Sequence, residues 1–261
     1  MRLASIRIAL AAPFMAACAS SASTQQPCID PAATTAGQTT VATAAASGPA
    51  DADSIAGSAP KACSDAKLAA DGLIDDFEDG DTQLAKVGGR DGYWWTSADS
   101  NGSTIAPKEV VGVAGGADSP RAVNFKGTTS GASGAWGVNF GVNFLSAKMP
   151  YDGSPYAGVS FKAKVGPNSS KKIRFKIGDI NTHQDAGVCT ACWNHFGKDV
   201  ELTEQWQEVR VLFTDLAQGS GWGQPRPPHL ATDKLWNIDF SIPPGSTYDV
   251  WVDDVRLLQC P

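Results

Sequence analysis

The sequence has few basic residues, few histidines and no long apolar run. Its 21 Lys and Arg are outnumbered by 27 Asp and Glu, which gives a net charge of −6, and it contains only 3 His. Because nucleic-acid binding requires a basic patch, we expect no nucleic-acid partner. The most apolar stretch, residues 8–17, is too short to span a bilayer.

The motifs of several common enzyme classes are also missing. The chain contains no G-x-S-x-G, no Walker phosphate loop, no H-E-x-x-H and no dinucleotide-binding glycine pattern. Its Asp and Glu residues are scattered, so no glycosidase carboxylate pair can be recognised from their spacing. The sequence therefore leaves catalysis as an alternative and not as the first prediction.

The first eighteen residues have the pattern of an export signal. Arg2 and Arg7 precede the apolar stretch, and small residues then lead to Cys18. This order resembles a bacterial lipobox, in which signal removal leaves a lipidated cysteine; an ordinary signal peptide is the alternative. We expect residues 1–18 to direct export and Cys18 to carry the only membrane anchor. Because Ala19 and not aspartate follows the cysteine, we expect that anchor in the outer membrane.

Composition divides the rest of the chain into two parts. Residues 19–70 consist mainly of Ala, Ser, Thr, Gly and Pro, which cannot bury enough apolar surface to offset the entropy of ordering. We interpret them as a flexible linker. Residues 71–261 are rich in Trp, Phe and Val and form the expected globular domain.

Apolar and polar residues alternate throughout residues 71–261. Segments such as AVNFKG, WGVNFGVNF, KKIRFKIGDI and YDVWVDDVRLL have this period of two, and clusters of Gly, Pro, Asn and Ser separate them. The pattern is typical of strands with one buried face. About ten such strands predict an all-β fold, an antiparallel two-sheet β-sandwich of the jelly-roll type.

The segment GVCTACWNHFG holds a C-x-x-C pair, Cys189 and Cys192. Three interpretations are open: a disulfide within the loop, a zinc site that adds His183 and His195, or a redox dithiol. Export favours the disulfide, and a redox pair is usually found at a helix start, which this loop lacks. A disulfide ring would stiffen the loop that carries Trp193 and His195, so that less entropy is lost on ligand binding.

The cysteines that remain after Cys18 cannot all pair with one another. Without Cys18, the 6 cysteines become five, an odd number. Cys28 and Cys63 both lie in the expected linker and are candidates for a bond to each other, with Cys260 left over.

Acidic residues cluster at both ends of the domain, in IDDFEDGD and in VWVDDVRLL. If the first and last strands are neighbours, Asp76, Glu78, Asp253 and Asp254 converge. Clustered carboxylates repel one another unless a cation bridges them, and calcium is the natural bridge outside the cell. We therefore expect a structural calcium ion; solvated acidic turns are the alternative.

The sequence contains 8 Trp, a high number for its length. Alternation points some indoles inward: Trp206, Trp251 and one of Trp94 and Trp95. Others lie beside polar or turn residues: Trp136, Trp193 and Trp222. Exposed indoles are costly without a partner, and sugar rings have apolar C–H faces that stack on them. The pattern predicts a ligand surface for carbohydrate, although each single Trp is also compatible with a core position.

Several segments of residues 73–258 resemble a known family. They are LIDDFEDGD, GGRDGYWWTSAD, YAGVSFKAKVG, IRFKIGD, WQEVRVLFTDL and STYDVWVDDVRLL. Together they resemble the exported galactose-binding-like jelly rolls of bacteria, and among these the family-eleven-type carbohydrate-binding modules attached to cellulases.

This resemblance implies a two-sheet jelly roll and a structural calcium near Glu78 and Asp253 or Asp254. It also implies a ligand cleft on the concave sheet or its loops. By the same analogy, the candidate ligand contacts are Trp95, Asp179, Asp185, Trp193 and His195.

The first function that we predict is non-catalytic binding of a polysaccharide or oligosaccharide by a cell-surface lipoprotein. Two alternatives stay open. One is a glycan-active hydrolase or lyase on the same fold that uses Asp185 and His195 as acid and base. The other is an envelope scaffold that binds a protein through the Trp surface, because fold alone does not fix function.

Overall fold

The computed structural model describes residues 57–261. The expected signal peptide, Cys18, Cys28 and most of the expected linker lie outside these residues. Within the described part, no helix is long and apolar enough to cross a membrane.

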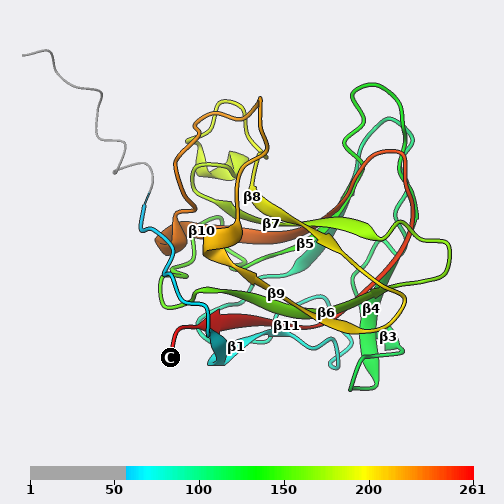
Figure 1. Cartoon of the computed structure of the whole chain (residues 1–261), viewed down its shortest axis with the longest axis horizontal. Coiled ribbons are helices and arrows are strands. Elements are labelled where there is room, and N and C mark those ends of the chain that lie inside the picture. Colours follow the sequence, from blue (N-terminus) through cyan, green and yellow to red (C-terminus); the bar gives the residue numbers. More distant parts are fainter. Residues whose placement is uncertain (1–56) are drawn as a thin grey trace, which may run out of the picture. The chain divides into compact units, whose positions relative to one another are not determined.

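In this described part, eleven antiparallel strands form two sheets, joined by loops and three short 3-10 turns (Figure 1). The first sheet has the order β3 (Val113–Ala114), β4 (Arg121–Thr128), β11 (Thr247–Gln259), β6 (Gly158–Val165) and β9 (Gln207–Leu212), and β1 (Lys67–Asp75) also pairs with β11. The second has the order β2 (Trp94–Ala98), β5 (Val138–Asn143), β10 (Leu235–Ile242), β7 (Lys172–Asp179) and β8 (Phe196–Glu201). The turns are η1 (Gln184–Ala186), η2 (Phe213–Asp215) and η3 (Thr232–Lys234). The predicted two-sheet β-sandwich is confirmed.

Phenylalanine rings from both sheets meet in the core. Phe125 of β4 and Phe140 of β5 lie with ring centroids 4.0 Å apart, and Phe161 of β6 meets Phe240 of β10 edge to face at 5.0 Å. All four side chains are fully buried. Each contributes about 1.5–3 kcal/mol by leaving water. One face of the second sheet is therefore buried in the core. Its other face points away from the first sheet.

The β-sandwich includes residues before residue 71. β1 starts at Lys67, Ala66 is buried, and Cys63 is bonded to Cys260. The candidate pairing of Cys63 with Cys28 is therefore wrong. This stretch was assigned to the linker because it has few large apolar residues. Its small alanines nevertheless pack against the domain.

Trp206 and Trp251 do not point into the core, which corrects the sequence interpretation. Both are partly exposed, and the Lys164 ammonium lies over their rings, 5.0 Å from the centroid of Trp206 and 5.1 Å from that of Trp251. In the first half of β11, Tyr248, Val250 and Val252 are buried, so Trp251 has the opposite parity and faces outward.

Candidate functional site

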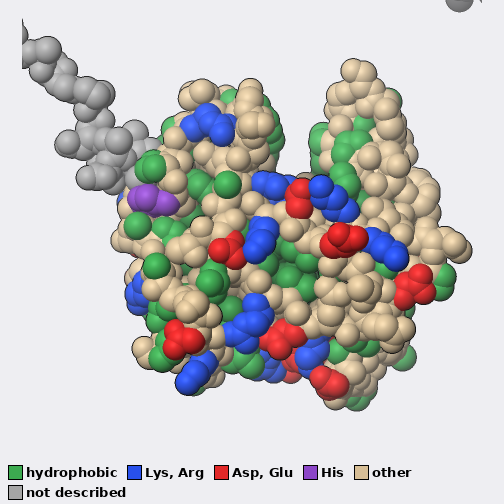
Figure 2. All heavy atoms as spheres, in the orientation of Figure 1, with side chains coloured by type: hydrophobic (Ala, Val, Ile, Leu, Met, Phe, Trp, Pro, Cys, Tyr) green, Lys and Arg blue, Asp and Glu red, His purple; other side chains and the backbone are tan. Residues whose placement is uncertain are grey.

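The outer face of the second sheet is the floor of a cleft of about 1080 Å³. Loops rise from both ends of its strands, and Figure 2 shows the hollow between two raised lobes. Residues 180–195, between β7 and β8, contribute to one wall, and residues 129–137 and 243–246 to the other. Since the walls stand at opposite strand ends, the cleft runs across the strands.

One row of the floor combines three large or charged side chains with two glycines. Cross-strand pairing aligns Trp95, Gly141, Asp239, Lys176 and Gly197 from β2 to β8. A Cβ atom on Gly141 would lie 2.8 Å from Trp95 Cζ2 and 2.9 Å from Asp239 Oδ1, and one on Gly197 would lie 2.8 Å from Lys176 Cγ. Each glycine thus leaves the space that its neighbour's side chain occupies, and the Trp95 ring lies along the floor beside a carboxylate.

Hydrogen bonds hold this row in place. Trp95 Nε1 donates to Asn143 Oδ1 at 3.1 Å. Lys176 Nζ lies 3.3 Å from Asp239 Oδ2 and donates to Asn139 Oδ1 at 3.4 Å. Burial raises the pKa of Asp239, although the Lys176 ammonium opposes the shift. The floor therefore offers an indole ring beside a set of amide, carboxyl and ammonium groups.

The more exposed acids of the cleft are also paired with bases. Asp199 lies 2.7 Å from Lys172 Nζ and 2.9 Å from Arg174 Nη1, and the Lys172 hydrogen bond, with that from Arg174, lowers the pKa of this carboxyl although burial opposes the shift. Asp185 lies 3.1 Å from Lys148 Nζ. The charges of the cleft are thus largely balanced within it, an arrangement that suits a ligand rich in hydroxyl groups.

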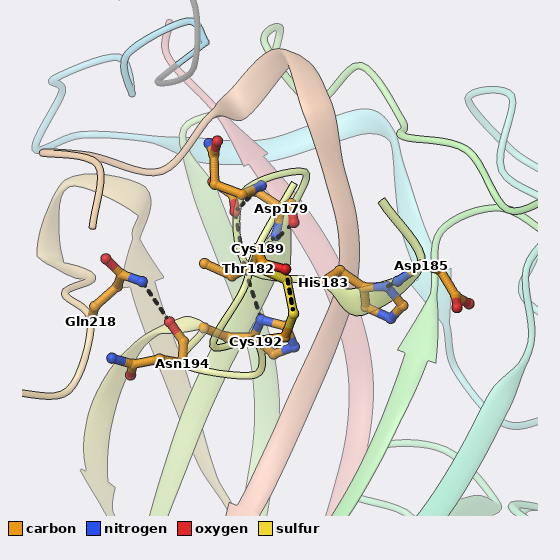
Figure 3. Close-up of a disulfide and its surroundings, with 10 residues drawn as sticks. Asp179, Thr182, His183, Asp185, Cys189, Cys192, Asn194 and Gln218 are labelled. Carbon is orange, nitrogen blue, oxygen red and sulfur yellow. Dashed lines mark hydrogen bonds between the residues drawn. A yellow bond between two sulfur atoms is a disulfide. The ribbon is translucent and has the colours of Figure 1, made fainter. Parts of the chain in front are cut away.

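Asp179 lies below the cleft and does not line it. It is the last residue of β7 and is fully buried. Its carboxylate accepts hydrogen bonds from Thr182 Oγ1 (2.9 Å), Asn181 N (3.1 Å) and Ala231 N (3.0 Å). Asp179 therefore connects the 180–195 loop to the segment before β10, and Figure 3 shows it beside Thr182.

His195 lines the cleft, but its ring is enclosed. Its Nδ1 lies 2.8 Å from Thr182 Oγ1, and its Nε2 has no hydrogen-bond partner and lies 3.9 Å from Asp239 Oδ2. Burial, together with the charge of Lys176, lowers the pKa of His195 well below its usual value. The imidazole is therefore neutral and contributes to the packing of the wall.

The C-x-x-C pair forms a disulfide, Cys189–Cys192, as predicted (Figure 3). Trp193 follows it directly, is 47% exposed and lines the cleft. The His183 ring lies between two indoles, edge to face with Trp193 at 4.9 Å and stacked on Trp236 at 4.8 Å. The disulfide loop thus carries an aromatic side chain at the mouth of the cleft.

A second loop is joined to the disulfide loop through Asn194. Its Nδ2 donates to Trp222 O at 2.6 Å and to Gly219 O at 2.9 Å, and Gln218 Nε2 donates to Asn194 O at 2.9 Å. Trp222 is 52% exposed and lines the same wall. The buried Asn194 therefore connects the two backbone segments that carry the exposed indoles Trp193 and Trp222.

Trp136 stands on the opposite wall and is 46% exposed. Asp99 fixes its backbone by accepting hydrogen bonds from Trp136 N at 3.1 Å and Gly137 N at 2.8 Å. The predicted exposure of Trp136, Trp193 and Trp222 is confirmed, and the structure brings the three to one cleft.

Four of the five candidate contacts line the cleft: Trp95, Asp185, Trp193 and His195. Asp179 is the one that does not. Sequence reasoning missed the charged floor residues Lys172, Arg174, Lys176 and Asp199, together with Asp239. The alternation in KKIRFKIGD was a usable signal, because the basic residues of β7 have the parity opposite to its buried apolar residues Ile173, Phe175 and Ile177.

The four expected calcium ligands have hydrogen-bond or ion-pair partners within the protein. Asp253 Oδ2 accepts from Ala117 N at 2.8 Å, Glu78 Oε1 accepts from Arg121 N at 2.8 Å, and Asp254 lies 2.7 Å from Lys162 Nζ. Within residues 57–261, no group of three or more His, Cys, Asp or Glu side chains is placed to hold a metal ion. Asp76 and the other three acids therefore form no such group, and the calcium ion stays a prediction.

No family model matches the chain, and neither does any curated protein. Solved structures do match. The family 11 carbohydrate-binding module of the cellulosomal cellulase Lic26A-Cel5E of Clostridium thermocellum superposes with a TM-score of 0.51 at 16% identity, over 76% of this chain and 97% of that chain. The fold resembles that of family 11 carbohydrate-binding modules, as predicted. A second structure of such a module, also from C. thermocellum and in complex with a β-1,3-1,4-mixed-linked tetrasaccharide, matches with a TM-score of 0.51 at 17% identity, over 72% of this chain and 96% of that chain.

Proposed function

We propose that this protein binds a polysaccharide or oligosaccharide in the cleft without catalysing its cleavage. The observation that carries the proposal is the convergence of three exposed indoles, Trp136, Trp193 and Trp222, around a polar floor. Indole faces stack on the C–H faces of sugars, while amide and charged groups bind hydroxyls. The bound tetrasaccharide in a protein of similar fold agrees with this assignment.

The shape of the cleft favours an internal stretch of a glycan chain. Its two walls stand at opposite strand ends, so no loop of either wall closes the path across the strands. A linear chain lying over β2, β5, β10, β7 and β8 would contact the Trp95 ring on the floor and the indoles of both walls. Such contacts are individually weak and give reversible binding.

The hydrolase or lyase alternative lacks support from the two residues first considered for it. His195 is enclosed and neutral, and its Nδ1 is hydrogen-bonded to Thr182. Asp185 is paired with Lys148. The enclosed His195 ring is therefore poorly placed to exchange a proton with a ligand in the cleft.

We also propose that Cys18 is lipidated and holds the protein in the cell envelope, with the outer membrane as the site. The support is the sequence pattern of residues 1–18 alone. Growth with an alkyne-tagged fatty acid should label the wild-type protein but not Cys18→Ala. Equal labelling of both proteins would contradict the anchor.

Affinity electrophoresis tests glycan binding. Gels that contain single soluble polysaccharides, β-1,3-1,4-glucan among them, should retard the wild-type protein with at least one glycan. The double variant W95A/W193A should abolish the retardation because it removes two stacking surfaces, and each single variant should weaken it. Trp251→Ala is the matched control, since its indole lies on the outer face of the other sheet.

Unchanged mobility of the wild-type protein across a broad panel would contradict the proposal. Capture of an envelope protein that oligosaccharide does not displace would favour the scaffold alternative. Release of reducing sugar that is lost in Asp185→Asn would favour the enzyme alternative.

A further inference from the structure

Trp193 has an unusual backbone for a bulky residue. Its φ is +76°, in the left-handed region, and the only other non-glycine residues with positive φ in residues 57–261 are Phe77, Asn168 and Asp254. Left-handed conformations are costly for large side chains and persist only where surrounding structure enforces them. Phe77 is buried, so core packing accounts for its conformation, whereas Trp193 is 47% exposed. Something other than burial must therefore hold Trp193.

Two constraints act on the Trp193 backbone. Trp193 N donates to Thr182 O at 2.8 Å, and Thr182 is itself fixed by the buried carboxylate of Asp179. The residue before Trp193 is Cys192, whose bond to Cys189 closes a ring of four residues. These two constraints hold the chain before the Trp193 φ angle, and the hydrogen bonds of the Asn194 side chain hold it after that angle. Opening the ring removes one of the two constraints on the preceding side.

The conformation places the indole at the cleft. The ring lies edge to face with His183 at 4.9 Å and with His195 at 5.8 Å, and the exposed part of the side chain lines the cleft together with Cys192. A backbone that relaxes to negative φ turns the side chain away from these two imidazoles. Ligand stacking on Trp193 therefore depends on the strained conformation.

We propose that the Cys189–Cys192 disulfide positions Trp193 for ligand binding, so that the affinity of the cleft depends on the redox state of this pair. The proposal rests on the function proposed above. An external dithiol reduces the disulfide: its S–S bond breaks, two electrons and two protons give thiols on both cysteines, and the reductant becomes a disulfide. Trp193 then relaxes and the ligand is bound more weakly.

The two disulfides of residues 57–261 have different expected roles. Cys63–Cys260 joins residues 197 apart, and Cys189–Cys192 joins residues 3 apart. Since the constraint on the unfolded chain grows with the length of the closed loop, the long-range bond contributes more to global stability. The C63S/C260S double variant is therefore a matched control for C189S/C192S.

The experiment measures affinity on the full chain for the glycan that is retained in the electrophoresis panel. C189S/C192S should weaken binding about tenfold, equivalent to roughly 1.4 kcal/mol. C63S/C260S should leave the affinity of the folded protein unchanged. In a Trp193→Ala background, removal of Cys189–Cys192 should have no further effect, because a positioning residue acts only through the group that it positions.

A spectroscopic measurement decides the proposal even if no glycan binds. In protein labelled with 5-fluorotryptophan, the Trp193 ¹⁹F resonance, assigned from Trp193→Phe, should shift in C189S/C192S and stay in place in C63S/C260S. An unshifted Trp193 resonance, or equal loss of affinity in the presence and absence of Trp193, would overturn the positioning role. Absence of binding together with a shifted resonance would overturn the proposed function alone.

Discussion

At the scale of single residues, burial determines the charge of the two histidines in the cleft. His195 and His183 both line the cleft. Burial lowers the pKa of His183 to about 4, and burial also lowers the pKa of His195 well below its usual value. Both rings are therefore neutral at neutral pH, and they serve as flat surfaces against Trp193.

The first prediction concerns these two imidazoles. Their C–H resonances should not titrate between pH 8 and pH 5.5 in an NMR titration, because burial disfavours the charged ring. The unfolded chain binds these protons near pH 6.5, so below that pH the two histidines lower the free energy of unfolding as pH falls toward 4. A midpoint near 6.5 for either ring would contradict its burial.

At the scale of elements, the 180–195 loop depends on the end of β7. Asp179 was expected to contact ligand but instead accepts three hydrogen bonds beneath the cleft. Burial raises the pKa of this carboxyl although those bonds oppose the shift. The loop conformation that presents Trp193 thus depends on a buried group that does not line the cleft.

The second prediction separates Asp179 from an exposed aspartate of the same loop. Asp179→Ala leaves Thr182 Oγ1 and two backbone N–H groups without their acceptor, so the free energy of unfolding should fall by about 3 kcal/mol or more. Asp185→Ala removes only a partly exposed ion pair with Lys148 and should cost less than about 1 kcal/mol. Urea denaturation of both variants makes the comparison, and equal costs would contradict the buried role of Asp179.

Alternation predicted the elements well but could not predict which parity faces the core. Trp251 and Val252 are both apolar, and only the sandwich shows that Val252 faces inward. The sequence also does not show which residues are neighbours on adjacent strands. Lys176 and Asp239 are 63 residues apart in sequence (239 − 176) and meet because β7 pairs with β10 in one register. A single sequence contains no direct record of that register, so the polar floor could not be derived from it.

At the scale of the whole molecule, the fold joins its own ends. β1 pairs with β11, and the Cys63–Cys260 bond lies just beyond this pairing. The sequence pattern did not predict that the first and last strands are neighbours. It indicated only that the acidic residues would converge if they were. The structure shows that adjacency, and the acids there are engaged by Lys162 and by backbone amides.

The third prediction follows from this closure. C63S/C260S should lower the free energy of unfolding by about 2–4 kcal/mol and the Tm by on the order of 10 °C, because the unfolded chain regains freedom over nearly the whole domain. Calorimetry should find a much smaller change for C189S/C192S. A larger loss from the short-range pair would contradict the division of roles between the two disulfides.

The most direct measurement of glycan binding in the cleft is the indole N–H spectrum of the ¹⁵N-labelled protein during titration with soluble oligosaccharides, starting with a β-1,3-1,4-linked tetrasaccharide. We predict that at least one glycan shifts the resonances of Trp95, Trp136, Trp193 and Trp222, while those of Trp206 and Trp251 stay in place. Shifts confined to Trp206 and Trp251, or no shift with any glycan, would contradict recognition in the cleft.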